Sequence, residues 1–298
     1  MAATPITTPR APGAGSARIG RLIGRTLLYL AAISLAVVFS IPTYWAVTGS
    51  FKTVAEIQQI PPIWIPETWH WENYKRVWEL VPFARFFANT VIITVAAGIG
   101  QVFTSALVGY GFARYRFRGS GVLFMLILCT IMFPAELTLI PTFIGFRELG
   151  WIDTFWPLIV PYWFGGGAFF IFLFRQFFMT VPGEILEAAR LDGAGHFRIF
   201  WQIVAPITKP AFAAAGIISF LNHWNDFLNP LIFLNSTSKY TLALGITAFD
   251  TGTVGIVSEP RDHLLMAATV MMTLPIVIVF FFAQKYFIQG IATTGLKG

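Results

Sequence analysis

The densest group of polar side chains within an apolar run lies between residues 222 and 229. Asn222, Asp226 and Asn229 are spaced i, i+4 and i+7, which places them on one face of a helix with Asn225 beside them. Polar residues inside apolar runs are costly, so they are functional hypotheses by default. Such a face can line a water-filled path and bind hydroxyl groups, or it can hold neighbouring helices together. The residues alone leave both interpretations open.

The sequence lacks the residue patterns of an enzyme. The four histidines are scattered over different loops and apolar runs, without metal-ligand spacing: His70, His196, His223 and His263. There is no G-x-x-x-x-G-K-[S/T] phosphate loop. No Ser/His/Asp or Cys/His arrangement suggests a nucleophile. We therefore predict no catalytic residue, no metal site and no cofactor bound by this chain.

The composition is that of an integral membrane protein. The 298 residues are 56% hydrophobic and only 11% charged, with a mean hydropathy of +0.70, whereas soluble domains carry about 25% charged residues. The net charge of +6 could suggest nucleic acid, but most Lys and Arg residues lie beside the ends of apolar runs. That placement is the usual signal of membrane topology.

Six apolar runs are long enough to cross a bilayer, which takes about 20 helical residues. They lie at about 26–47, 89–112, 121–143, 155–178, 207–234 and 264–287. In the third run Glu136 stands between Pro134 and Pro141, where a structural role at an unwound turn is favoured over a proton relay. The prediction is an all-α, polytopic membrane protein with about six transmembrane helices.

Charge bias predicts the orientation of these spans. Arg114, Arg116 and Arg118 fall in one short loop without an acidic residue, which is typical of a cytoplasmic loop. Six spans place both termini and residues 183–206 on that same side. Residues 1–20 are predicted to be a disordered cytoplasmic tail, followed by one transmembrane domain over residues 21–298.

The predicted outer loop at 51–87 is rich in Pro and Trp. Tryptophan at a membrane boundary is usually an interfacial anchor. Docking of an external partner is the alternative interpretation. We expect the anchor role to dominate.

A polar, glycine-broken segment at 183–206 separates the fourth and fifth runs. Helix-forming residues lead up to Asp192, and Gly193 and Gly195 supply the backbone freedom that ends a helix. A second short helix is expected from His196 to Ile203, before Pro206. Such a segment adds nothing to membrane spanning, so we expect it to contact a cytoplasmic partner.

This segment resembles the motif of the binding-protein-dependent ABC importer permeases, E-A-A, three residues, G, nine residues, I-x-L-P. The matching residues are Glu187, Ala188, Ala189, Gly193, Ile203 and Pro206, with Ala205 where the pattern has Leu. Further stretches look like the maltose-type carbohydrate subfamily, at 73–74, 86–90, 139–141, 224–228 and 289–298. The resemblance implies the type I ABC importer permease fold, with 183–206 as the coupling segment.

The family resemblance also implies a set of partners and site residues. The partners would be a second homologous permease in a heterodimer, two cytoplasmic ATPases that bind ATP and Mg, and an extracytoplasmic sugar-binding protein. The chain itself would be a multi-pass plasma (inner) membrane protein. Coupling would rest on the motif residues together with Asp192, and a flexible finger at Thr251, Gly252, Thr253 and Gly255 would probe the binding protein.

The resemblance implies an oligosaccharide as the cargo, and glycerol phosphates are the alternative. A phosphorylated substrate favours basic residues along its path, and the spans offer essentially Arg175, near a cytoplasmic end. This favours a neutral sugar, although the second permease could hold the substrate. From a different class, an ion-coupled secondary transporter would show repeated halves, and no convincing repeat is present. A membrane scaffold without a transport role is the third possibility.

Overall fold

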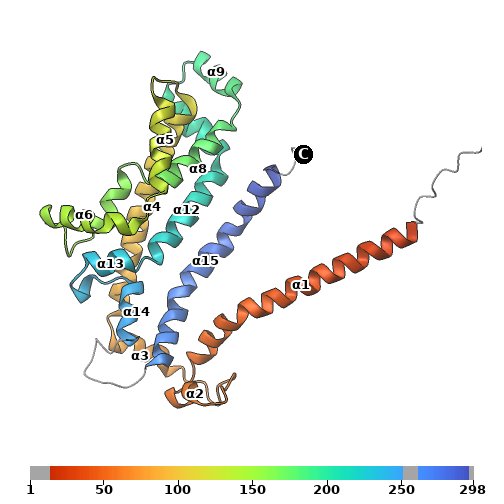
Figure 1. Ribbon diagram of the computed structural model, residues 1–298, viewed down its shortest axis with the longest axis vertical. Coiled ribbons are helices and arrows are strands. Elements are labelled where there is room, and N and C mark those ends of the chain that lie inside the picture. Colours follow the sequence, from red (N-terminus) through yellow and green to blue (C-terminus); the bar gives the residue numbers. More distant parts are fainter. Residues whose placement is uncertain (1–13, 251–260, 295–298) are drawn as a thin grey trace, which may run out of the picture.

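The computed structural model describes residues 14–250 and 261–294, and all regular elements in that part of the chain are helices (Figure 1). Four of the described helices are long and apolar enough to cross a bilayer, or six when each of two bent helix pairs counts as one span. This confirms the all-α, polytopic fold predicted from the sequence.

Helix α4 (Phe83–Arg114) is the axis of the bundle, with α8 (Ala168–Met179) and α12 (Lys209–Trp224) packed along it. Helix α15 (Asp262–Thr294) lies against α12. Gly109 permits the close approach of α4 to α8, because a Cβ atom there would lie 2.8 Å from the Cβ atom of Phe174. Small residues bring membrane helices together in this way.

Helix α1 (Ala14–Gly49) projects away from this bundle (Figure 1). It touches α15 only near its C-terminal end, where a Cβ on Gly49 would lie 2.2 Å from the sulfur of Met266. The helix begins at Ala14, so the prediction of a disordered tail over residues 1–20 is wrong from that residue onward. Residues 1–13 lie outside the described residues.

The third predicted span is two helices rather than one. Helices α5 (Ser120–Ile131) and α6 (Ala135–Glu148) meet at a bend of 100°. Pro134 sits at the bend, where its fixed φ and missing N–H favour a break. Pro141 lies inside α6 without ending it.

The fourth span is also irregular at its centre. A short helix, α7 (Trp156–Ile159), and a 3-10 turn, η1 (Val160–Trp163), precede three consecutive glycines with positive φ. A Cβ atom on Gly166 would lie 1.9 Å from the Ser105 hydroxyl of α4. Only glycine allows the backbone to come this close while adopting φ +65.

The prediction of one continuous fifth span at 207–234 is wrong. Helix α12 ends at Trp224, and a separate short helix, α13 (Leu228–Phe233), follows. Pro230 explains the break, because it has no N–H for the carbonyl of residue 226 and its ring would clash with that carbonyl. The Asp226 side chain then accepts a hydrogen bond from the Asn229 N–H at 3.2 Å, which starts α13.

The segments predicted as outer loops contain more helix than the sequence indicated. The loop at 51–87 holds α2 (Val54–Gln58) and α3 (Glu72–Leu80). The segment after α13, predicted as a connecting loop, contains a 3-10 turn, η3 (Thr237–Lys239), and α14 (Leu242–Asp250). Leu242 and Phe249 are buried in a cluster with α3, α4 and α15, so α14 is part of the packed bundle.

Candidate functional site

The motif residues lie on two short helices joined by a tight turn at one end of the bundle. Helix α9 (Gly183–Leu191) is followed by α10 (His196–Ile199), a π-helical turn, η2 (Phe200–Val204), and α11 (Ala205–Ile207). Gly193 has φ +79 and ends α9. Its N–H donates to Arg190 O, and the Ala194 N–H donates to Ala189 O at 2.9 Å. These two hydrogen bonds form a Schellman cap, which favours glycine at position 193.

Helix α9 is seated on the bundle through one apolar face. Leu186 is 3% exposed and Ala189 is 9% exposed. Both belong to a buried cluster with Tyr110 of α4, Phe178 of α8 and Phe200. These two side chains connect α9 to the ends of α4 and α8 through one close-packed apolar cluster.

Arg114 stabilises the connection between α8 and α9 with hydrogen bonds. Its guanidinium donates to the backbone carbonyls of Phe178 and Val181, which lie at the end of α8 and just beyond it. Helix ends leave carbonyls without partners, and a basic side chain satisfies them. The last turn of α4 therefore holds the chain at the point where it leaves α8 and enters α9.

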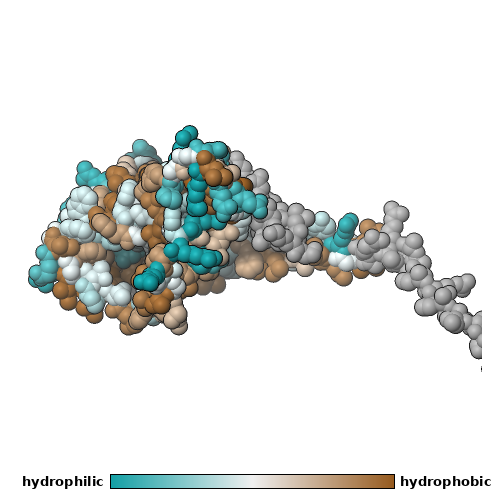
Figure 2. All heavy atoms as spheres, turned by 90° about the horizontal axis from the view of Figure 1, so that it is seen from above, coloured by the Kyte–Doolittle hydropathy of each residue, from teal (hydrophilic) through white to brown (hydrophobic). Residues whose placement is uncertain are grey.

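The opposite face of α9 is open to solvent. Glu187, Ala188 and Asp192 are exposed, and Leu191 is 89% exposed. Figure 2 looks onto this end of the molecule, where hydrophilic and hydrophobic side chains lie side by side. Leu191 is exposed on the same face as two acidic residues and the small Ala188. Such a face can pack into a cleft of a partner protein. Of the remaining motif residues, Ile203 packs on the buried cluster and Pro206 lies exposed on α11.

The polar residues predicted on one helical face are divided by the break after Trp224. Asn222 is exposed on α12, whereas Asp226 and Asn229 follow the break. The Asn225 side chain donates to Leu221 O at 2.9 Å. The Asn229 amide donates to the Asp226 carboxylate at 2.9 Å. The single face inferred from their spacing is therefore wrong, because that inference assumed a continuous helix.

Sequence reasoning missed a buried polar network beside this break. Gln101 of α4 donates to Gly166 O at 2.8 Å, and its side-chain oxygen accepts a bond from Ser219 at 2.7 Å. His223 Nε2 lies 3.2 Å from the same oxygen, and its ring stands edge-on to Tyr162 at 4.4 Å. The signal was present in the sequence, since Gln101 is a polar residue within an apolar run. The network joins the glycine turn of the fourth span to the end of α12.

Two other sequence predictions concern the finger residues and metal binding. The proposed finger residues Thr251, Gly252, Thr253 and Gly255 lie outside the described residues. Within the described part of the chain, no group of three or more His, Cys, Asp or Glu side chains is placed to hold a metal ion.

The family described as "Binding-protein-dependent transport system inner membrane component" matches residues 101–293. The chain belongs to this family. It is a multi-pass inner-membrane permease of the carbohydrate uptake type, a non-catalytic subunit of an ABC importer with no cofactor of its own. The importer comprises ATPases and an external binding protein besides the permease.

Curated relatives cover nearly the whole permease. The probable ABC transporter permease protein YurM of Bacillus subtilis (strain 168) is 31% identical over 93% of this chain and 90% of its own length. The arabinooligosaccharides transport system permease protein AraQ of the same organism is 33% identical, with 92% and 96% covered. The sn-glycerol-3-phosphate transport system permease protein UgpE of Yersinia pestis bv. Antiqua (strain Antiqua) is 33% identical, with 84% and 89% covered.

A solved structure shares the fold along the full chain. It is a bacterial ABC transporter involved in the import of the acidic polysaccharide alginate, with a TM-score of 0.77 and 26% identity. The match covers 95% of this chain and 100% of that one.

Proposed function

We propose that this permease forms half of the translocation pathway of an ATP-driven oligosaccharide importer, and that α9 is the docking site of a cytoplasmic ATPase. The observation that carries the proposal is the two-faced character of α9. Leu186 and Ala189 pack its inner face against the bundle. Glu187 and Ala188 are exposed on its opposite face. A helix with one face packed on the bundle and the other face free can transmit the displacement of a bound partner to the bundle.

The proposed coupling follows from this rigid seat. When ATP closes the ATPase dimer, the helix held in its cleft moves with it. Arg114 and the apolar cluster connect α9 to α4 and α8, so that these spans must shift together. Such rigid-body movements switch access between the two sides of a membrane. In this proposal Gly193, together with the motif residues Ile203 and Pro206, keeps α9 and the helical chain from α10 onward at a fixed angle.

The proposal requires α9 and both termini to be cytoplasmic. The excess of Lys and Arg on that side of the predicted spans supports this orientation. Helix α9 and helix α3 lie at opposite ends of the bundle (Figure 1), so α3 would face the outside. There the residues Thr251, Gly252, Thr253 and Gly255 would contact the binding protein, as the family resemblance implies.

We further propose that the break after α12 lies beside the path of the cargo. Asn222 and Asn225 are exposed there, and the Asp226–Asn229 pair is partly exposed. Amide and carboxylate groups can exchange hydrogen bonds with sugar hydroxyls at little cost when they face water. A second, homologous permease would close the path from the other side. Residues 22–44 of α1 form a long apolar surface that is exposed along its whole length, which supports such a partner or a lipid contact.

An oligosaccharide is the cargo we favour, and glycerol phosphate is the alternative. Relatives with near-equal identity are named for arabinooligosaccharides and for glycerol-3-phosphate, so identity does not decide between them. The Arg175 guanidinium near the end of α8 lies 4.3 Å from the Phe124 ring. A phosphate favours several basic partners along its path, and the scarcity of basic residues within the spans supports a neutral cargo.

The test is uptake into proteoliposomes that contain the complete importer and its binding protein. ATP inside the vesicles should drive uptake of an oligosaccharide from a panel that includes arabinooligosaccharides and glycerol-3-phosphate. An imposed ion gradient without ATP should drive none. Uptake of glycerol-3-phosphate alone would overturn the choice of cargo, and ion-driven uptake without ATP would overturn the proposed mechanism.

A further inference from the structure

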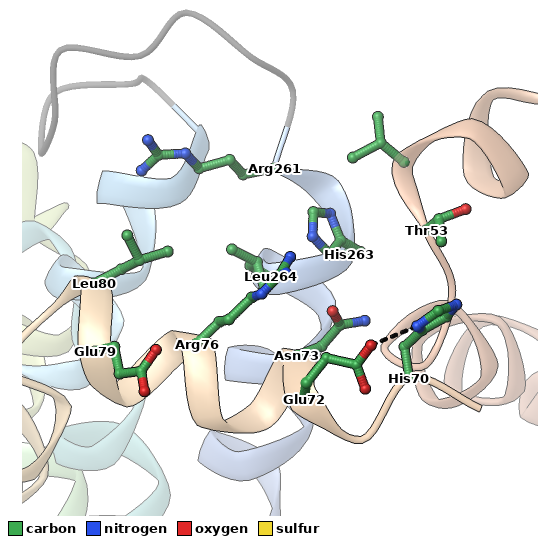
Figure 3. Close-up of a pocket in the computed structure, with 11 residues that line it drawn as sticks. Thr53, His70, Glu72, Asn73, Arg76, Glu79, Leu80, Arg261, His263 and Leu264 are labelled. Carbon is green, nitrogen blue, oxygen red and sulfur yellow. Dashed lines mark hydrogen bonds and ion pairs between the residues drawn. The ribbon is translucent and has the colours of Figure 1, made fainter. Parts of the chain in front are cut away.

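A charged cavity of about 590 Å³ lies at the end of the bundle opposite α9 (Figure 3). It is formed by α3, the chain that precedes α3, and the N-terminal end of α15. The charged and polar residues that line it are Thr53, His70, Glu72, Asn73, Arg76, Glu79, Arg261 and His263. None of the sequence patterns or comparisons assigns a role to this cavity.

Among the described residues, the cavity presents two arginines without an ion pair and a buried histidine nitrogen without a hydrogen bond. Arg76 and Arg261 make no ion pair with the described part of the chain. His263 is only 8% exposed, and its Nδ1 atom is buried without a hydrogen bond. Figure 3 shows its ring within the cavity, between Arg76 and Thr53. A buried nitrogen without a partner costs free energy, so a ligand that satisfied it would gain that amount.

The backbone adds to this positive character. Helix α15 begins at Asp262, directly beside the cavity, and it is 33 residues long. The N–H groups of Leu264 and Leu265 donate to Arg261 O at 2.9 Å, which leaves the N–H groups that precede them to attract an anion. The Asp262 carboxylate lies in the same turn and offsets part of this effect, so the Arg261 guanidinium beside it is the main positive group at this helix end.

The acidic residues of the lining are already engaged. Glu72 accepts from His70 Nδ1 at 2.6 Å, and Glu79 lies 3.5 Å from Lys75 Nζ. The Asn73 amide donates to the carbonyls of Ser50 and Lys52 at 3.0 Å. The Arg76 charge acts on Glu72 through space, but neither Arg76 nor Arg261 forms an ion pair in the described part of the chain, so both guanidinium groups can bind a ligand.

We propose that this cavity receives a carboxylate side chain, Asp or Glu, from the external binding protein. Guanidinium groups hold carboxylates in bidentate, charge-assisted pairs. The same segment carries exposed tryptophans next in sequence to lining residues, with Trp69 at 51%, Trp71 at 67% and Trp78 at 51% exposed. Arginine together with tryptophan is the composition of energetically important protein interfaces. The inference rests on the proposed function, because it places this end of the bundle outside the cell.

The experiment uses the complete importer in nanodiscs and measures ATPase activity against binding-protein concentration. Stimulation of the wild-type complex tests the proposed function. Arg76→Glu and Arg261→Glu test the cavity, and each should raise the half-saturating concentration about tenfold or more, as expected for loss of a charge-assisted hydrogen bond. Raising the salt concentration should weaken the wild-type response in the same direction.

A matched control and a rescue make the result specific. Arg85→Glu makes the same charge change at the same end of the bundle but outside the cavity, and it should leave the half-saturating concentration unchanged. A Lys substitution of the contacting acid on the binding protein should restore the response of Arg76→Glu. Co-elution of each variant with the ATPases in size-exclusion chromatography shows that it has folded and assembled.

Three results would overturn the inference. The first is saturation of both arginine variants at the wild-type concentration. The second is an equal shift with Arg85→Glu, which would indicate only long-range charge. The third is calorimetric binding of sodium galacturonate to the importer without binding protein, abolished by Arg261→Glu, which would assign the cavity to free acidic sugars. A wild-type complex that is not stimulated at all would instead contradict the proposed function.

Discussion

At the scale of single residues, Gly193 controls the geometry of the motif segment. Its φ of +79 is strained for residues with a Cβ atom, at a cost of about 1–2 kcal/mol. Proline cannot adopt this φ, and it would also remove the N–H that donates to Arg190 O. We predict that Gly193→Pro abolishes ATP-driven uptake while the protein still inserts into the membrane.

The matched control for Gly193 is its neighbour Gly195. That residue has φ −68, and a Cβ atom there would meet no other atom within 4 Å. Gly195→Ala should transport at the wild-type rate in the same vesicles. Normal uptake by Gly193→Pro would contradict the coupling role of the segment.

Asp153 joins the loop before α7 to the segment after α13 and gives a pH-dependent contribution to stability. Ser236 donates hydrogen bonds from its hydroxyl and backbone, and Lys239 lies 3.0 Å away. The Ser236 bonds, and then Lys239, hold the pKa of the Asp153 carboxyl well below its ordinary range. Because the folded-state pKa is lowered, this stabilisation is present at neutral pH and is lost as the pH falls below the ordinary carboxyl range.

We predict that Asp153→Asn lowers the free energy of unfolding at pH 7 by about 1–2 kcal/mol, the scale of lost charge-assisted bonds. The measurement is thermal unfolding in detergent between pH 3 and pH 7. The melting temperatures of the wild type and the variant should converge as the pH falls. A constant difference over that range would show that the carboxylate charge is not responsible.

At the scale of elements, the inner face of α9 tests whether the helix must be seated on the bundle. Leu186→Ala removes a side chain that is 3% exposed, and such truncations cost about 2–5 kcal/mol. We predict that this variant loses coupling, measured as uptake per ATP hydrolysed. Ile185→Ala, on the 43% exposed neighbour in the same helix, should remain coupled. Equal coupling in both variants would contradict the mechanical role of α9.

The break after α12 tests the proposed path. Replacing Asn225 and Asp226 together by Ala removes the exposed amide and the carboxylate that starts α13. Loss of such a local side-chain hydrogen bond costs about 1 kcal/mol, which the bundle should tolerate. We predict an assembled importer with impaired uptake or altered stimulated ATPase activity. Wild-type transport by this double variant would contradict the proposal that the break after α12 lies beside the path of the cargo.

Much of the fold could be predicted from the positions of apolar runs, because a bilayer imposes one length on every span. The breaks within spans could not, since they depend on partners far away in sequence. Gly166 is needed only because Ser105 of another helix comes so close. The motif segment was located from its polarity between two apolar runs and from its family motif, whereas the site at α15 depends on His263 and Arg76, which are far apart in the chain.

At the scale of the whole molecule, two surfaces lie at opposite ends of one bundle (Figure 1). The exposed face of α9 is at one end, and the cavity with Arg76 and Arg261 is at the other. Helices α4, α12 and α15 run between them, with glycine turns and polar contacts at mid-length. A movement imposed at one end can therefore reach the other through packed helices, as an importer that responds to both ATP and a binding protein requires.

Photo-crosslinking at Ala188 tests the central claim, that α9 docks the ATPase, most directly. In a Cys129→Ser background, which removes the single cysteine, a benzophenone is attached to Ala188→Cys on the exposed face of α9 or to Thr68→Cys at the opposite end. We predict that the probe at position 188 crosslinks to the ATPase subunit and the probe at 68 does not. An ATPase adduct at 68, or none at 188 in an assembled complex, would contradict the account.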